Sequence, residues 1–103
     1  MIDFKTCYGM TYFDENDLKE TQINHRVELE YYRTNICAED NFEYGIEICK
    51  KEYINNNVKV ETNKIENITS SSDKVIEIIN TLKKYKVTPV GLNDVLEDLL
   101  KAN

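Results

Sequence analysis

The chain has 103 residues, of which 41% are hydrophobic and 31% are charged, with three glycines and one proline. This composition is typical of one compact domain over residues 1–103, and it argues against a disordered or fibrous chain. The formal net charge is −6 and only two of the cations are arginines, Arg26 and Arg33, so nucleic acid is not an expected partner.

The amino-terminal region combines one apolar stretch with one polar stretch. In residues 1–13, Phe4, Thr6 and Tyr8 stand at alternate positions, which predicts a strand at the edge of a sheet. Residues 14–24 are mainly polar, so we expect a loop there.

Two runs of period two follow, at residues 26–36 and 42–49, and each predicts a strand with one face in water. The apolar residues are odd-numbered in the first run and even-numbered in the second: Val27, Leu29, Tyr31 and Phe42, Tyr44, Ile46, Ile48. The short polar break at residues 38–41 predicts an antiparallel hairpin. Odd residues must then face even ones, and we expect Leu29 to lie opposite Ile46 or Ile48.

A further strand is predicted after the three asparagines at residues 55–57, which suit a turn because asparagine tolerates the left-handed backbone conformation. Val58 and Val60 alternate with Lys59 and Glu61, so the valines are expected on the core face. The phase breaks at residues 63–64, which indicates a bulge or a change of direction.

The hydrophobic period changes near Ser70 from every second residue to every third or fourth. Serines at residues 70–72, followed by Asp73, are typical of a helix start. One stripe of the first helix contains Val75, Ile78, Ile79, Leu82 and Tyr85. Thr88 and Pro89 are interpreted as the cap and first residue of a second helix, whose stripe contains Leu92, Val95, Leu96 and Leu99.

Strands over residues 1–68 followed by two helices over residues 70–102 predict an α+β fold. We expect an antiparallel meander of three to four strands, covered on one face by the two carboxyl-terminal helices.

If the helices cover the apolar face, the other face carries many carboxylates. The expected partner-binding residues on that face are Glu28, Glu30, Tyr32, Glu43, Glu47 and Glu61. Like charges facing each other across strands cost up to about 1 kcal/mol relative to neutral pairs, which suggests a basic protein partner. The alternative is an ordinary solvated surface, because salt screens such charges.

No residue pattern indicates a catalytic, cofactor or metal site. Cys7, Cys37 and Cys49 are odd in number, which favours reduced thiols and a cytoplasmic location. Zinc sites usually contain a closely spaced cysteine pair, which the set of three cysteines and His25 lacks. We find no apolar run of membrane-spanning length and no signal peptide.

The segments at residues 44–48 and 87–98 resemble those of a family of small uncharacterised clostridial proteins of unknown function. The similarity extends over about residues 27–100 and supports the fold. The resemblance implies no activity.

The leading hypothesis is a small non-enzymatic interaction or regulatory protein that binds a protein partner through its acidic face or an exposed strand edge. Self-association through such an edge, giving a homo-oligomer, is also considered. One alternative is an acidic inhibitor that mimics nucleic acid and occupies a basic groove. Another is a small enzyme that uses Cys49 or the sheet carboxylates.

Overall fold

The structure is a computed structural model, and it describes residues 2–38 and 41–101. Four antiparallel strands form one sheet in the order β1-β2-β3-β4, so the chain is a meander with the α+β fold that the sequence predicts. The elements are β1 (Ile2–Tyr12), α1 (Glu15–Thr21), β2 (Arg26–Ala38), β3 (Asn41–Ile54), β4 (Asn57–Thr69), α2 (Ser72–Lys84) and α3 (Leu92–Lys101).

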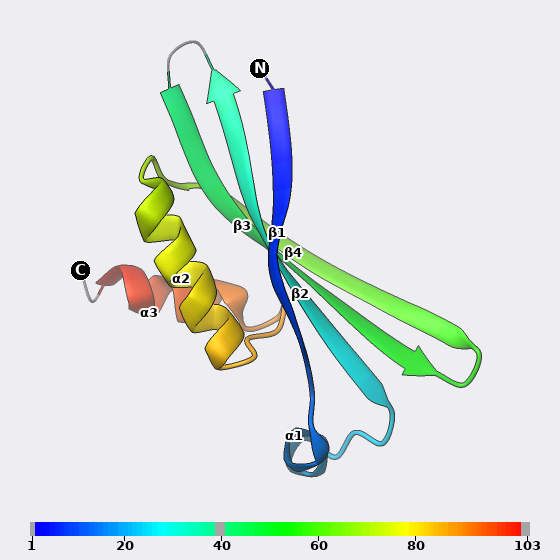
Figure 1. Cartoon of the computed structure of the whole chain (residues 1–103). Coiled ribbons are helices and arrows are strands. Elements are labelled where there is room, and N and C mark those ends of the chain that lie inside the picture. Colours follow the sequence, from blue (N-terminus) through cyan, green and yellow to red (C-terminus); the bar gives the residue numbers. More distant parts are fainter. Residues whose placement is uncertain (1, 39–40, 102–103) are drawn as a thin grey trace.

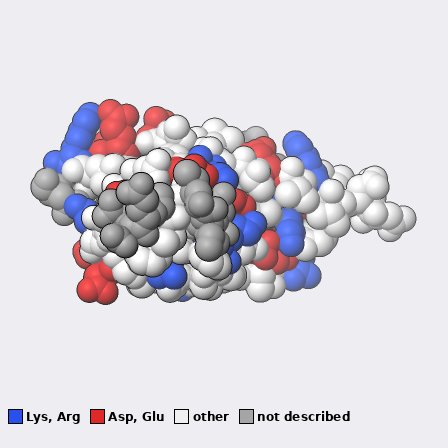
Figure 2. Space-filling model, turned by 90° about the horizontal axis from the view of Figure 1, so that it is seen from above, with Lys and Arg blue, Asp and Glu red and all other residues white. Residues whose placement is uncertain are grey.

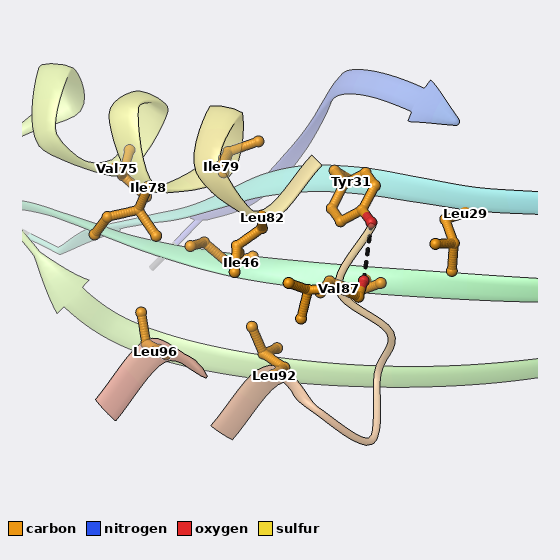
Figure 3. Close-up of a cluster of buried hydrophobic side chains, with 11 residues drawn as sticks. Leu29, Tyr31, Ile46, Val75, Ile78, Ile79, Leu82, Val87, Leu92 and Leu96 are labelled. Atoms are coloured by element: carbon orange, nitrogen blue, oxygen red, sulfur yellow. Dashed lines mark hydrogen bonds between the residues drawn. The ribbon is translucent and has the colours of Figure 1, made fainter. Parts of the chain in front are cut away.

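The helices α2 and α3 lie on the same face of the sheet, near its middle, and both ends of the long strands extend beyond them (Figure 1). The buried core consists of Leu29, Tyr31, Ile46, Ile48, Val75, Ile78, Ile79, Leu82, Val87, Leu92 and Leu96. Figure 3 shows these side chains directed toward one another from the sheet and the two helices. The predicted packing of two helices on one sheet face is therefore confirmed.

One buried hydrogen bond ties the sheet to the connection between α2 and α3. The hydroxyl of Tyr31, whose side chain has no exposed surface, donates to the carbonyl oxygen of Val87 over 2.9 Å (Figure 3). This bond satisfies a main-chain carbonyl of a buried residue and fixes where the connection crosses the sheet.

Helix α1 occupies the segment that the sequence predicts to be a loop. It contains no buried residue, so hydrophobic periodicity could not indicate it. A capping box holds its start, because the Asp14 and Asp17 side chains each accept from the other's backbone N–H over 2.9 Å. Lys86 forms ion pairs with both carboxylates and so attaches α1 to the end of α2.

The predicted alternation in the β2–β3 hairpin is confirmed, but the expected register is wrong. Leu29 lies opposite Lys50, and Glu28 lies opposite Lys51. Either expected register would have placed Glu47 opposite Glu28 or Glu30, a pairing of like charges that is unfavourable across strands. The observed register places Glu47 opposite Tyr32 instead.

The face expected for the valines of β4 is also wrong. Asn55 has a φ of 56°, as the asparagine-rich turn predicts, and the turn sets Ile54 opposite Asn57. Val58 then lies opposite Tyr53 and Val60 opposite Lys51, on the face away from the helices. Because this part of the sheet extends beyond the helices (Figure 1), the turn rather than burial selects the face.

Three details of the carboxyl-terminal half differ from expectation. Tyr85 is 68% exposed and does not join the buried stripe of α2. Pro89 precedes the second helix, which begins at Leu92, because the N–H of Gly91 turns back to the carbonyl of Thr88. The irregularity of β4 lies beyond residue 65, where Asn67 has a φ of 56°, rather than at residues 63–64.

Candidate functional site

We call the sheet face opposite α2 and α3 the open face. The described strands place on it the side chains of Lys5, Cys7, Arg26, Glu28, Glu30, Tyr32, Glu43, Glu47, Cys49, Lys51, Tyr53, Val58, Val60 and Thr62. Five of the six expected partner-binding residues are therefore on one face. Glu61 is the exception: it lies opposite Lys50, which lies opposite the buried Leu29, so it belongs to the helix side.

Two carboxylates at the centre of the open face form ion pairs. Glu30 accepts from the Lys51 ammonium at 3.0 Å and from the Tyr32 hydroxyl at 3.1 Å. Glu47 binds the Lys5 ammonium at 3.1 Å, and that ammonium also lies 4.4 Å from the centre of the Tyr32 ring. Each of these carboxylates thus has a cation within the molecule.

Glu28 lies in an aromatic setting at the α1 end of the face. It is only 8% exposed, and it accepts a hydrogen bond from the Tyr53 hydroxyl over 2.8 Å. The Cζ atom of the Arg26 guanidinium lies 4.8 Å from the centre of the Tyr12 ring and 5.3 Å from the centre of the Tyr53 ring. The arrangement is a polar packing cluster in which the carboxylate is largely shielded from water.

The open face is consequently mixed in charge rather than uniformly acidic. On the side of the molecule that Figure 2 shows, seen from above the view of Figure 1, acidic and basic side chains are interspersed. Four of the expected carboxylates lie on the open face. Of these, Glu43 forms neither an ion pair nor a hydrogen bond with a described residue. The like-charge repulsion on which the acidic-face hypothesis depends is largely relieved by the observed register.

The titration behaviour of the central cluster disfavours acid–base chemistry near neutral pH. Burial, followed by the hydrogen bond to Glu30, raises the pKa of Tyr32 to about 12. Burial acts to raise the pKa of Glu30, but the hydrogen bonds from Lys51 and Tyr32 outweigh it and the pKa is lowered. The hydrogen bond to Glu30 raises the pKa of Lys51. Each pKa moves away from neutrality, whereas general acids and bases work best near the operating pH.

The cysteines and His25 do not gather into one site. All three thiols are free, and burial raises the pKa of Cys49, which disfavours the reactive thiolate. His25 instead lies 3.7 Å from a Glu52 oxygen. Within residues 2–38 and 41–101, no group of three metal-ligating side chains is close enough to hold an ion.

A surface hollow of about 440 Å³ lies along α2 and reaches Leu99 of α3. Its polar lining is engaged locally: Ser71 caps α2 by accepting from the Lys74 N–H, and Thr81 donates to the Glu77 carbonyl. The charged side chains of the lining, Asp73, Lys74 and Glu77, belong to α2 alone, so the hollow is a shallow surface of one helix rather than a site built from several elements.

The free edge of β4 is an exposed strand edge of the kind that the leading hypothesis names, although the sequence did not indicate which strand provides it. We call Asn57–Ile65 the β4 edge: it pairs with β3 without interruption on one side, and no described strand lies beyond it on the other. Val58 is 52% exposed and Val60 is 56% exposed. The opposite edge, in β1, has a break in register between Cys7 and Gly9 and is therefore less regular.

The turn determines which backbone groups of the β4 edge are unpaired. A two-residue hairpin closes with a hydrogen-bonded pair, here Ile54 and Asn57, and hydrogen-bonded pairs then alternate with non-bonded ones. Asn57, Lys59, Glu61 and Asn63 therefore bond to β3. Val58, Val60 and Thr62 direct their N–H and C=O groups away from β3, toward any strand that is added to the sheet.

The fold and the candidate site describe a small α+β meander with an exposed strand edge and a mixed-charge open face. The chain belongs to the family of unknown function DUF6514, which it matches over residues 10–102. No curated protein and no solved structure shows a significant match to the chain. Among the described residues, no helix has the length and apolar character needed to cross a membrane.

Proposed function

We propose that this protein is a small non-enzymatic interaction module that binds a protein partner by adding an extended segment of that partner to the β4 edge. The observation that supports this most strongly is the uninterrupted pairing of residues 57–65 at a free edge, with exposed valines beside it. Strand addition uses the main-chain groups of such an edge for affinity and the adjoining side chains for specificity.

The uncharged tip of the β3–β4 hairpin supports the same proposal. The segment from Tyr53 to Val58 contains no charged side chain, and it projects beyond the helices (Figure 1). A projecting, uncharged edge is accessible to a partner, and it lacks the charged side chains that hinder the pairing of edge strands. The proposal includes the cytoplasmic location and the clostridial source that the sequence suggests.

The other functions considered from the sequence receive less support. A nucleic-acid mimic needs carboxylates free to meet a basic groove, whereas Glu30 and Glu47 bind Lys51 and Lys5. An enzyme that uses Cys49 needs a stabilised thiolate, and burial raises the pKa of that thiol. The edge is therefore preferred to the acidic face as the binding surface.

The substitution Val60→Pro tests this function because it removes an N–H that points away from β3 and leaves the bonds between β3 and β4 in place. Val60→Thr is the matched control, because it keeps the N–H and a β-branched side chain. Both variants and the wild-type chain, each carrying a tag, would be used to capture proteins from a native extract that contains the untagged chain.

A protein retained by the wild-type chain and by Val60→Thr, but lost with Val60→Pro, is the expected result. Circular dichroism of the three purified chains would establish that they share one fold. Equal capture by a folded Val60→Pro chain would contradict binding at the β4 edge.

A further inference from the structure

Two charged side chains near the β4 edge lack ion-pair partners within the described chain. Lys59 and Glu61 are two residues apart and lie on the same face. Lys59 lies opposite Glu52 and its charge helps to lower the pKa of that carboxyl group, but neither Lys59 nor Glu61 comes within ion-pair distance of an opposite charge among the described residues. Glu61 Oε1 is buried without a hydrogen-bond partner, because Lys50, which lies opposite Glu61, binds Glu52 at 2.9 Å instead. The side chain of Glu61 is half-buried, and it has no cation at ion-pair distance among the described residues.

We infer that the partner at the β4 edge is a second copy of this chain, joined in antiparallel fashion about a two-fold axis at Val60. The inference rests on the proposed function, because it names the occupant of the same edge. In this dimer the four-stranded sheets of the two copies form one continuous sheet, and both pairs of helices lie on the same side.

Charge complementarity selects this register. With Val60 opposite its own copy, Lys59 of each chain faces Glu61 of the other, so two ion pairs form by symmetry. The neighbouring symmetric registers place Lys59 opposite Lys59 or Glu61 opposite Glu61, and both of these pairings are repulsive. The two-fold axis thus joins the two charges that have no ion pair in the single chain.

The hydrogen-bonding pattern of the edge fits the same register. Val60 would bond to Val60 of the second copy, and Val58 would bond to Thr62 of the second copy, using N–H and C=O groups that point away from β3. Lys59 and Glu61 then form a non-bonded pair, in which side chains approach more closely. The valines, exposed by 52% and 56% in the single chain, each gain a cross-strand neighbour on the open face.

Charge reversal provides a test with an internal rescue, measured by sedimentation equilibrium of the full chain at several concentrations. The wild-type chain should be dimeric at high concentration. Lys59→Glu and Glu61→Lys should each weaken the dimer by about tenfold or more, because two attractive pairs become repulsive. An equimolar mixture of the two variants should associate again, because the carboxylate introduced at position 59 of one chain then faces the ammonium introduced at position 61 of the other.

Controls separate the edge from net charge. Lys101→Glu and Glu97→Lys change the charge by the same amounts at α3 positions whose side chains are 71% and 64% exposed, and they should leave the dimer unchanged. Circular dichroism would verify that every variant is folded, and the double variant Lys59→Glu/Glu61→Lys should dimerise like the wild-type chain.

Two results would overturn the inference: a wild-type chain that stays monomeric up to millimolar concentration, or a dimer unaffected by both single reversals. If the chain is monomeric and Val60→Pro still abolishes capture of a different protein, the proposed function holds and only the identity of the partner is wrong. If the dimer forms and Val60→Pro leaves it intact, both the inference and the proposed edge are contradicted.

Discussion

Removing the Tyr31 hydroxyl tests how the helical layer is attached to the sheet. In Tyr31→Phe the carbonyl oxygen of Val87 loses its 2.9 Å hydrogen bond at a site where Tyr31 is fully buried and Val87 is 8% exposed. A buried carbonyl left without a partner costs about 1–3 kcal/mol, and we expect a loss of that size in the free energy of unfolding. For a domain of this length, each 1 kcal/mol corresponds to about 4–8 °C in Tm.

Urea and thermal unfolding of the wild-type chain and of Tyr31→Phe would measure this loss. Tyr85→Phe is the control, because Tyr85 is 68% exposed and its hydroxyl is hydrated in both states, so a change within about 0.5 kcal/mol is expected. Burial raises the pKa of Tyr31, so its contribution to stability is complete below about pH 10 and declines at higher pH as the unfolded chain ionises. A Tyr31→Phe chain as stable as Tyr85→Phe would refute the role given to this hydrogen bond.

Three further predictions concern close packing and ion pairing. Gly45→Ala should lower the free energy of unfolding by about 1–3 kcal/mol, because its Cβ would lie 2.4 Å from the Ile65 carbonyl oxygen; an unchanged urea midpoint would show that this contact is not tight. Gly91→Ala, whose Cβ would meet nothing closer than 3.8 Å, should be neutral or stabilising by up to about 1 kcal/mol in the same assay, and a clear loss would contradict this. The hydrogen bond from Lys86 lowers the pKa of Asp17, so its stabilising contribution is present above about pH 4 and is lost at lower pH. The Tm difference between the wild-type chain and Asp17→Asn should therefore shrink between pH 6 and pH 2, and a constant difference would argue against the ion pair.

The sequence predicts the fold class well because burial imposes a period on the residues that meet in the core. Leu29 and Ile46 of the sheet and Leu82 of α2 all occupy the positions that their spacing predicts. Their alternation also predicts that odd residues of β2 face even residues of β3, as observed. Where one face of a strand or helix is buried, the hydrophobic periodicity indicates which side chains face the core.

The features that the sequence did not predict lie where burial is absent. Helix α1 is held by a capping box and by Lys86, which is distant in sequence, so no local pattern shows its attachment. The face of Val60 is set by the turn at Asn55. The β2–β3 register places Glu28 opposite Lys51, a pairing that apolar spacing alone does not specify. The close approach of β4 to Gly45 depends on a bulge opposite it, which a period of two does not contain.

The sequence predicted which carboxylates share the open face, but not their ion pairs or the position of the free edge. The strand periodicity correctly placed Glu28, Glu30, Glu43 and Glu47 on one face, yet the cations that bind Glu30 and Glu47 come from other strands and depend on the register. Because the valines of β4 were expected on the core face, the sequence predicted neither their exposure nor the unpaired backbone groups of the β4 edge. The turn residues were the signal that could have corrected it, because a two-residue hairpin fixes the pairing of both strands.

Residue-resolved amide hydrogen exchange tests the β4 edge most directly. It would be measured at a protein concentration of a few micromolar and again near 1 mM. The amides of Lys59, Glu61 and Asn63 bond to β3 and should be protected at both concentrations, whereas those of Val58, Val60 and Thr62 should exchange rapidly when dilute and become protected when concentrated. Rapid exchange at residues 58, 60 and 62 at both concentrations, or equal protection of all six amides in the dilute sample, would contradict the account.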